Sequence, residues 1–217
     1  MNYEAAIFDL DGTLLDTLDD LADSVNQVLI DFGMPVHPAA PYRYFVGDGM
    51  LNLVRRAAPP GTGDDTVRAM ARLMDDKYAA NWANKTRPYD GVPAMLAAFR
   101  ARGMKMGVLS NKPDAFTGLI IRHYFPETAF DAVFGARETV PRKPDPAGAL
   151  EIARLFGVPP PRFLYFGDTD TDMKTGVAAG MRTIGVSWGF RPVEELIGAG
   201  AQQIIDKPEQ AAALMEE

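Results

Sequence analysis

The stretch that decides the fold is AAIFDLDGTLLD, residues Ala5–Asp16. Its first part, Ala5–Leu10, is a short apolar run that stops at a turn signal, Asp11-Gly12, and this pattern is typical of a buried strand. A strand buried on both faces indicates a parallel sheet. Asp9 and Asp11 therefore fall at the carboxyl end of the first strand, where open parallel sheets bind their ligands.

The residues after this strand predict a helical insertion. Apolar residues recur at the helical period over Leu18–Phe32, and Gly33 is the expected end of that helix. Two further helical stretches cover residues 42–57, with a break at Gly47 and Gly49, and residues 64–84. Between residues 11 and 102 no stretch is typical of a strand, so we expect a helical insertion in this part of the chain.

From Gly91 the pattern changes to helices that alternate with short apolar runs. The expected helices cover residues 92–102, 114–123, 146–156, 172–179 and 209–215, and the expected strands cover residues 104–109, 130–134, 163–166, 183–186 and 203–205. This alternation indicates right-handed βαβ units. The predicted fold class is α/β, with a doubly wound parallel sheet, a Rossmann-like core and a helical segment inserted after the first strand.

Composition limits the possible functions. The 217 residues carry a net charge of −7, which argues against broad binding of nucleic acid, although a locally positive pocket could still bind a small anion. The absence of cysteine excludes thiolate catalysis, and two histidines do not suffice for a His-rich metal site, so any metal must use oxygen ligands. No apolar run approaches the ~20 residues of a membrane helix. Because residues 1–4 also lack a secretory pattern, we expect a cytoplasmic protein without membrane contact.

Polar residues follow several of the predicted strands. They are Asp9 and Asp11 after the first strand, Ser110 and Asn111 after residues 104–109, Lys143 after residues 130–134, and Asp168, Asp170 and Asp172 after residues 163–166. Carboxylates that meet at one sheet edge raise one another's pKa unless a cation lies among them, and Mg²⁺ prefers such oxygen ligands. Any single Asp could instead cap a helix or form an Asx turn, so the prediction depends on the whole set.

The motif Asp9–Asp16 resembles the signature of the haloacid dehalogenase-like phosphatases. The other motifs of that family follow in the required order, with Ser110, then Lys143 in the segment RKPDP, then Gly167–Asp172. This resemblance covers the whole chain and implies a phosphoric monoester hydrolase. It also implies a discontinuous α/β catalytic core of residues 1–15 and 86–217, and a helical cap domain of residues 16–85.

The resemblance assigns roles to the acidic residues. It implies that Asp9 attacks phosphorus and forms an aspartyl phosphate, while Asp11 is the general acid and later the general base. It also implies Mg²⁺ as the cofactor, held by the Asp9 carboxylate, the Asp11 backbone carbonyl and Asp168. Asp172 is expected to orient this site without contacting the cation itself.

The resemblance also provides the groups that bind the phosphoryl oxygens. Ser110 is expected to donate a hydrogen bond to them, together with backbone N–H groups near Leu10 and Asn111. Lys143 is expected to stabilise their negative charge.

Residues Tyr42–Gly49 are similar to the cap segment of bacterial phosphoglycolate phosphatases. This similarity implies a small anionic phosphate ester, 2-phosphoglycolate, as the substrate. The planar guanidinium of Arg43 suits its carboxylate, and Gly47 lets a cap loop approach the substrate. Arg43 could equally be a solvated arginine on a helix. Whether the chain forms a homodimer is left open.

Other functions share these residues. A sugar-phosphate phosphomutase uses the same nucleophile and metal, and a phosphatase for another small phosphate ester or for pyrophosphate is also compatible with the motifs. A dehalogenase is disfavoured because Asp11 is an acid/base group that its chemistry does not need. A non-enzymatic binding module is disfavoured because every catalytic position is filled.

Overall fold

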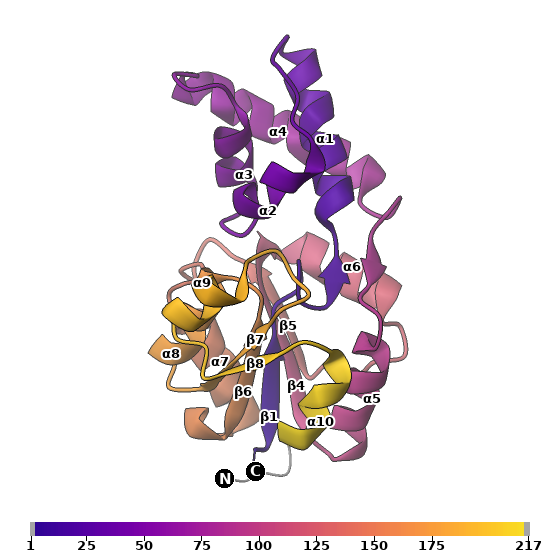
Figure 1. Cartoon of the computed structure of the whole chain (residues 1–217), viewed down its shortest axis with the longest axis vertical. Helices are drawn as coiled ribbons and strands as arrows, with labels where there is room; N and C mark the ends of the chain where they lie inside the picture. Colours follow the sequence, from indigo (N-terminus) through magenta and orange to yellow (C-terminus); the bar gives the residue numbers. More distant parts are fainter. Residues whose placement is uncertain (1–2, 215–217) are drawn as a thin grey trace. The chain divides into compact units, whose positions relative to one another are not determined.

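The computed structural model describes residues 3–214 and divides into two compact units (Figure 1). One unit comprises the described residues up to Leu15 and from Pro88 onward, and we call it the α/β unit. The other, Asp16–Arg87, is called the helical unit. The helical unit therefore interrupts the α/β unit shortly after its first strand.

The α/β unit contains a six-stranded sheet in the order β5-β4-β1-β6-β7-β8. Its strands are β1 (Ala5–Phe8), β4 (Lys105–Pro113), β5 (Ala132–Ala136), β6 (Phe163–Gly167), β7 (Arg182–Val186) and β8 (Gln203–Ile205). Each neighbouring pair is parallel. The chain runs outward from β1 through β4 to β5 and then crosses back to β6 on the other side of β1. Such a reversal creates the crevice in which this class of sheet binds ligands. The predicted α/β fold class is confirmed.

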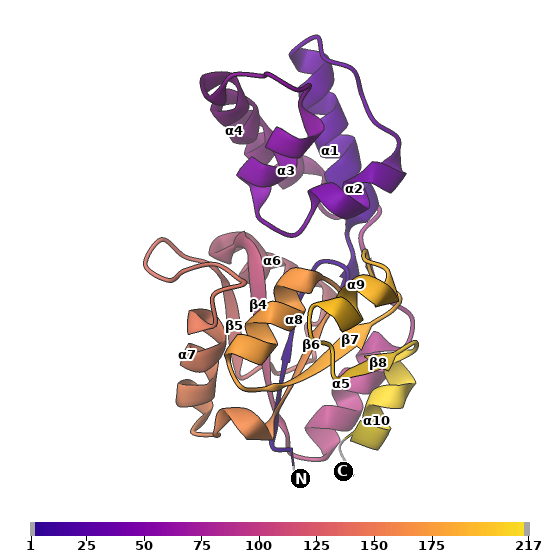
Figure 2. The same ribbon diagram turned by 60° about the vertical axis from the view of Figure 1, so that its left-hand side comes forward.

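Helices cover both faces of this sheet (Figures 1 and 2). One face carries α5 (Val92–Ala101), α6 (Asp114–Tyr124) and α10 (Ala211–Leu214), and the other carries α7 (Ala147–Phe156), α8 (Asp170–Ala178) and α9 (Val193–Gly198). Two short 3₁₀ helices, η1 (Pro160–Arg162) and η2 (Pro208–Gln210), precede β6 and α10.

The core fixes β1 at the centre of the sheet. Successive residues of a strand point to opposite faces, and Ile7 accordingly joins an apolar cluster with Ile152 of α7. On the other face the ring of Phe8 packs against Phe99 and Phe166, with centroid distances of 5.5 and 4.9 Å. Full burial of one such side chain contributes about 1.5–3 kcal/mol. The position of the residue that follows β1 is therefore determined by packing on both faces.

The helical unit has its own core and polar contacts. Its helices are α1 (Leu18–Asp31), α2 (Ala39–Phe45), α3 (Met50–Ala57) and α4 (Asp64–Asn81). The Tyr42 hydroxyl donates a hydrogen bond to Asn26 (2.7 Å), which also accepts one from the backbone N–H of His37 (3.0 Å). The His37 ring in turn lies 2.8 Å from the Ala57 carbonyl oxygen. His37 therefore has a structural role in this unit.

The structure corrects several details of the predicted elements. β2 (Leu15–Asp16) and β3 (Arg87–Pro88) form a two-stranded sheet where the sequence predicts none, because two residues are too few to show a period. β4 extends through Ser110 and Asn111 to Pro113 instead of ending before them. α8 begins at Asp170, where Thr169 caps it, and α9 is absent from the predicted elements. The end of the predicted last helix, residue 215, lies outside the described residues.

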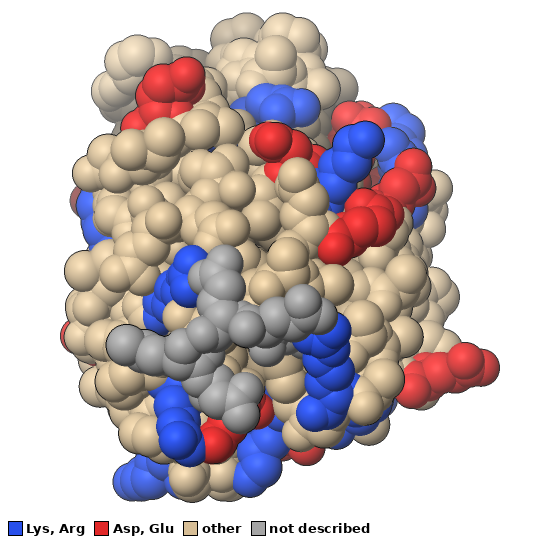
Figure 3. Space-filling model, turned by 60° about the horizontal axis from the view of Figure 1, so that its bottom comes forward, with Lys and Arg blue, Asp and Glu red and all other residues tan. Residues whose placement is uncertain are grey.

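Most charged side chains lie at the surface, as in folded proteins generally. Figure 3 shows one face, on which Lys and Arg are interspersed with uncharged residues and with Asp and Glu. Within the described part of the chain, the buried charged residues are Asp9, Asp20, Lys112, Lys143, Asp168, Asp172 and Arg191. Burying a charge is costly unless it is paired, so these residues are the first candidates for a functional site. None of the described helices combines the length and hydropathy that crossing a bilayer requires.

Candidate active site

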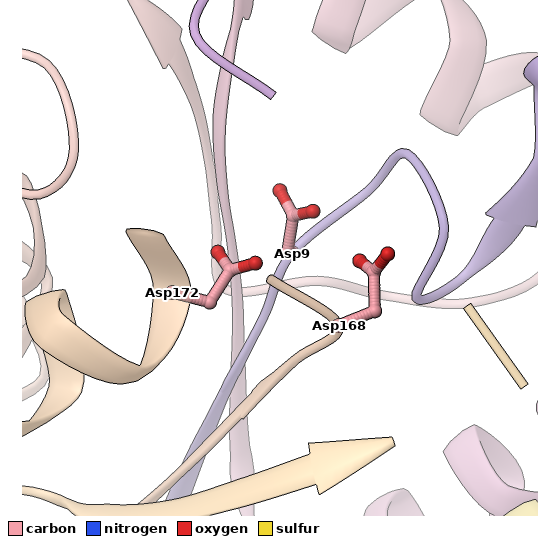
Figure 4. A group of neighbouring side chains, drawn as sticks. All are labelled: Asp9, Asp168 and Asp172. Atoms are coloured by element: carbon pink, nitrogen blue, oxygen red, sulfur yellow. The ribbon is translucent and has the colours of Figure 1, made fainter. Parts of the chain in front are cut away.

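Three buried carboxylates gather where β1 and β6 end (Figure 4). Asp9 follows β1, and its backbone N–H donates to the Phe166 carbonyl of β6 (3.0 Å). Asp168 follows β6 directly, and Asp172 lies in the first turn of α8. One carboxylate oxygen from each lies within 4.8 Å of the others. The structure thus brings together acids that are far apart in the sequence.

Lys143 pairs with two of these acids. Its Nζ lies 2.7 Å from Asp9 Oδ1 and 2.6 Å from Asp172 Oδ1. The Lys143 backbone is held by Asn111, whose amide donates to the Lys143 carbonyl (3.1 Å) and accepts from the Lys143 N–H (3.0 Å). The Asn111 side chain therefore positions the loop that carries the lysine.

Asp168 is held from two directions. Its Oδ1 accepts a hydrogen bond from Thr13 Oγ1 (2.9 Å), and its Oδ2 accepts one from the Phe190 N–H (2.8 Å). Gly12 and Gly189 pack so closely against this side chain that a Cβ at either position would collide with it. Gly12 also has a φ of 93°, which disfavours other residues. Both glycines therefore make room for the Asp168 carboxylate.

Asp172 is fixed by the capping box of α8. Its carboxylate accepts hydrogen bonds from the Thr169 N–H (3.2 Å) and the Thr169 hydroxyl (2.7 Å). The Asp172 N–H donates back to the same hydroxyl (3.3 Å). With its other oxygen bound to Lys143, the carboxylate is well placed to orient that ammonium group.

The site carries an excess of negative charge. Three carboxylates against the one ammonium of Lys143 leave a formal excess of two negative charges. Burial, and then the charge of Asp172, hold the pKa of Asp9 well above its ordinary value and raise that of Asp168 to about 7. Burial alone would lower the pKa of Lys143, but the charges of Asp172 and Asp9 outweigh it and raise that pKa. A buried set of hard oxygen donors with this excess charge fits a divalent cation.

Asp11 has a different partner, which the sequence analysis missed. Its Oδ1 accepts a hydrogen bond from Lys112 Nζ at 2.8 Å, and the Lys112 side chain is only 4% exposed. The Lys112 N–H donates to Ser110 Oγ (3.1 Å), so the Ser110 hydroxyl hydrogen is directed to another acceptor. The spacing could have revealed Lys112, because residues two apart in an extended strand share a face.

Other supporting residues were also missed. Thr13 and Phe190 contact Asp168 as described, and Trp188 Nε1 donates to the Thr13 carbonyl (3.0 Å). These contacts join the turn after β1 to the segment after β7. No local pattern reveals them, since each joins residues far apart in the sequence.

The predicted substrate contacts Arg43 and Gly47 belong to the helical unit. Arg43 is exposed on α2, and Gly47 has a φ of 127° in the loop between α2 and α3. Arg56 of α3 braces this loop by an ion pair with Asp48 and a hydrogen bond to the Phe45 carbonyl (3.1 Å). Contact of Arg43 and Gly47 with a substrate stays a prediction.

The comparison with protein families agrees with these motifs. Residues 6–186 match the model of the haloacid dehalogenase-like hydrolases. The chain belongs to this family, as the resemblance of its motifs predicts.

The relatives are phosphoric monoester hydrolases. Phosphoglycolate phosphatase of Pseudomonas putida is 34% identical over 196 residues, which are 87% of this chain and 72% of that protein. N-acetylmuramic acid 6-phosphate phosphatase of Pseudomonas aeruginosa is 30% identical over 217 residues, which are 100% of this chain and 96% of that protein. A solved structure from Lactobacillus delbrueckii subsp. bulgaricus, provisionally named a phosphoglycolate phosphatase, has a TM-score of 0.92 and 29% identity and covers 99% of both chains.

Proposed function

We propose that this protein is a Mg²⁺-dependent phosphatase that hydrolyses a small phosphomonoester through a phosphorylated Asp9. The observation that carries the proposal is the buried group of Asp9, Asp168 and Asp172 with Lys143 among them. Such an excess of buried negative charge does not stabilise the folded protein. It suits a site that binds a cation and an electron-poor phosphorus atom.

The reaction has two steps. A carboxylate oxygen of Asp9 attacks phosphorus, the bond from phosphorus to the ester oxygen breaks, and Asp11 gives its proton to the departing oxygen. Asp11 then takes a proton from water, whose oxygen attacks phosphorus and releases the Asp9 carboxylate. Both acids come from one turn after β1, which supports this division of roles.

The phosphoryl oxygens are bound by residues of the same sheet edge. The Ser110 hydroxyl donates to one oxygen, and backbone N–H groups near Leu10 and Asn111 donate to others. Lys143 stabilises the negative charge that the oxygens share in the transition state. Asn111 contributes a second time, because it holds the Lys143 backbone.

The cation ligands that we propose are supported by the same geometry and by the family resemblance. The Asp9 carboxylate, the Asp11 backbone carbonyl and Asp168 hold Mg²⁺, while Asp172 orients Lys143. When bound, Mg²⁺ offsets the repulsion between the nucleophile and the phosphate. Thr13 and the Phe190 N–H fix the direction of the Asp168 carboxylate, and its remaining lone pairs stay available for the cation.

We propose that residues 16–85 act as a cap domain over the core of residues 1–15 and 86–217. Arg43 and Gly47 then contact the substrate from the cap. A cytoplasmic location and a homodimer stay predictions.

The substrate proposed first is 2-phosphoglycolate, which the names of several relatives support. N-acetylmuramic acid 6-phosphate is the second candidate, because a relative that acts on it aligns over the full length of this chain. A sugar-phosphate phosphomutase differs only in the fate of the phosphorylated Asp9.

The test is phosphate release from 2-phosphoglycolate, N-acetylmuramic acid 6-phosphate and p-nitrophenyl phosphate, with Mg²⁺ or with a chelator. We expect Mg²⁺-dependent release, with the highest kcat/KM for 2-phosphoglycolate. A preference for the sugar phosphate would replace 2-phosphoglycolate as the assigned substrate and leave the phosphatase assignment unchanged. Transfer of phosphate between sugar positions without release would indicate the mutase, and no turnover of any ester would refute the proposal.

A further inference from the structure

The proposed reaction gives no task to Lys112, a buried cation of the α/β unit. Lys112 lies on β4 with its side chain 4% exposed, and its Nζ donates to Asp11 Oδ1 at 2.8 Å. Lys143 already pairs with Asp9 and Asp172. The two lysines therefore serve different acids, with Lys143 beside the nucleophile and Lys112 beside the acid/base residue.

The position of Lys112 relative to the reaction follows from its neighbours. Its backbone N–H donates to the hydroxyl oxygen of Ser110, which is proposed to bind the phosphoryl group. Its ammonium group lies beside Asp11, which is proposed to protonate the leaving oxygen. In the proposed reaction Lys112 is therefore on the leaving-group side of the phosphorus atom, beside the residue that protonates the departing oxygen.

We propose that Lys112 binds a carboxylate on the leaving group and thereby selects phosphate esters of 2-hydroxy acids. This inference rests on the proposed function and refines its substrate class. In such esters the carboxylate is attached to the carbon that carries the departing oxygen. A cation that contacts the acid/base residue at that oxygen is therefore within reach of the carboxylate.

The chemistry of the ammonium group suits this task. It has three donors in a compact charge, so it can contact Asp11 and a substrate carboxylate together. A sugar 6-phosphate places no carboxylate beside its departing oxygen, and p-nitrophenyl phosphate has none. Lys112 also belongs to the α/β unit together with Asp11, so the inference does not depend on where the helical unit and Arg43 lie.

The test compares two esters that differ only at this position. These are 2-phosphoglycolate and 2-hydroxyethyl phosphate, in which a hydroxymethyl group replaces the carboxylate. In Lys112→Met we expect the ratio of their kcat/KM values to fall roughly 10- to 100-fold, as for loss of a charged hydrogen bond, with most of the change in KM. Lys112→Arg should retain part of the preference because it keeps the charge. Lys105→Met is the matched control, since Lys105 lies at the opposite end of β4 and should leave the ratio unchanged.

Each outcome has a distinct meaning. Equal losses on both esters in Lys112→Met would overturn the inference and assign Lys112 to the support of Asp11. A wild-type protein without preference for the carboxylate would also overturn it. Should the methionine variant fail to fold, Lys112→Gln takes its place in the same ratio measurement. Absence of all phosphatase activity in the wild type would instead refute the proposed function.

Discussion

Buried aspartates occur in both units, but their surroundings differ. In the helical unit, Asp20 is 1% exposed and accepts hydrogen bonds from the Lys85 N–H (2.9 Å), the Thr86 N–H (2.8 Å) and the Thr86 hydroxyl (2.8 Å). In the α/β unit, three aspartates lie close together, and the one ammonium group among them, that of Lys143, pairs with Asp9 and Asp172 only. Hydrogen bonds within the fold satisfy the carboxylate of Asp20. The three acids of the α/β unit keep negative charge that no neighbouring cation among the described residues balances.

This difference separates a structural acid from acids that suit a functional site. Asp20 connects α1 to Lys85 and Thr86 through neutral hydrogen-bond donors, so its carboxylate does not need a bound cation. The acids of the α/β unit repel one another, and burial strengthens this repulsion. Such a group persists at a cost in stability, and the cost is offset when a cation binds.

The largest expected effect is on Asp9, the proposed nucleophile. Asp9→Asn keeps the shape of the side chain and removes the negative charge that makes its oxygen nucleophilic, so kcat should fall by about 10⁴-fold or more. Phosphate release and circular dichroism measure activity and folding separately. Activity within tenfold of wild type in a folded variant would remove Asp9 from the covalent role.

A smaller effect is expected at Asp11, the proposed acid/base residue. Asp11→Asn should slow hydrolysis of alkyl phosphates by roughly 10²- to 10⁴-fold, which is the usual contribution of general acid–base catalysis. The loss on p-nitrophenyl phosphate should be smaller, because its phenolate leaves without a proton. Equal losses on both kinds of ester would place proton donation elsewhere.

The acid of the helical unit should behave differently. Asp20→Asn removes the charge that accepts bonds from Lys85 and Thr86, and we expect a loss of about 1.5–3 kcal/mol in the free energy of unfolding. Urea unfolding followed by circular dichroism measures it. The kcat of the folded variant should stay near that of wild type, and a loss as large as that of Asp9→Asn would erase the distinction between the two kinds of acid.

The smallest effect concerns pH. Without metal, the pKa of Asp168 is raised to about 7 from its ordinary value of 3.8, by burial and by the charge of Asp172. Between these values the folded state binds more protons than the unfolded state, so the stability contributed by Asp168 is present below about pH 4 and lost as the pH rises through about 7. Urea unfolding in a chelator between pH 4 and pH 8 should show this decline. Asp168→Asn should make the decline shallower, and the part that remains is expected from Asp9, whose pKa is also raised. An unchanged slope in that variant would contradict the raised pKa of Asp168.

The sequence predicts the parts of this arrangement that follow local patterns and topology. The alternation of helices and strands after Gly91 predicts the parallel sheet. Because ligands bind at the carboxyl ends of such strands, the sequence also predicts that Asp9 and Asp168 lie close together. Lys112 was missed because β4 continues beyond its apolar run. The structural role of Asp20 could not be predicted. An acid in the first turn of a helix is ordinarily solvated and stabilises the helix by its interaction with the helix dipole.

Binding of Mg²⁺ to the metal-free protein tests most directly whether the charge excess of the α/β unit is a cation site. Isothermal titration near neutral pH, in two buffers of different ionisation enthalpy, measures both affinity and proton release. The account predicts saturable binding with proton release in wild type and in Asp20→Asn, and an affinity at least about 10-fold weaker in Asp168→Asn. Equal affinity in wild type and Asp168→Asn, or no binding to wild type, would contradict it.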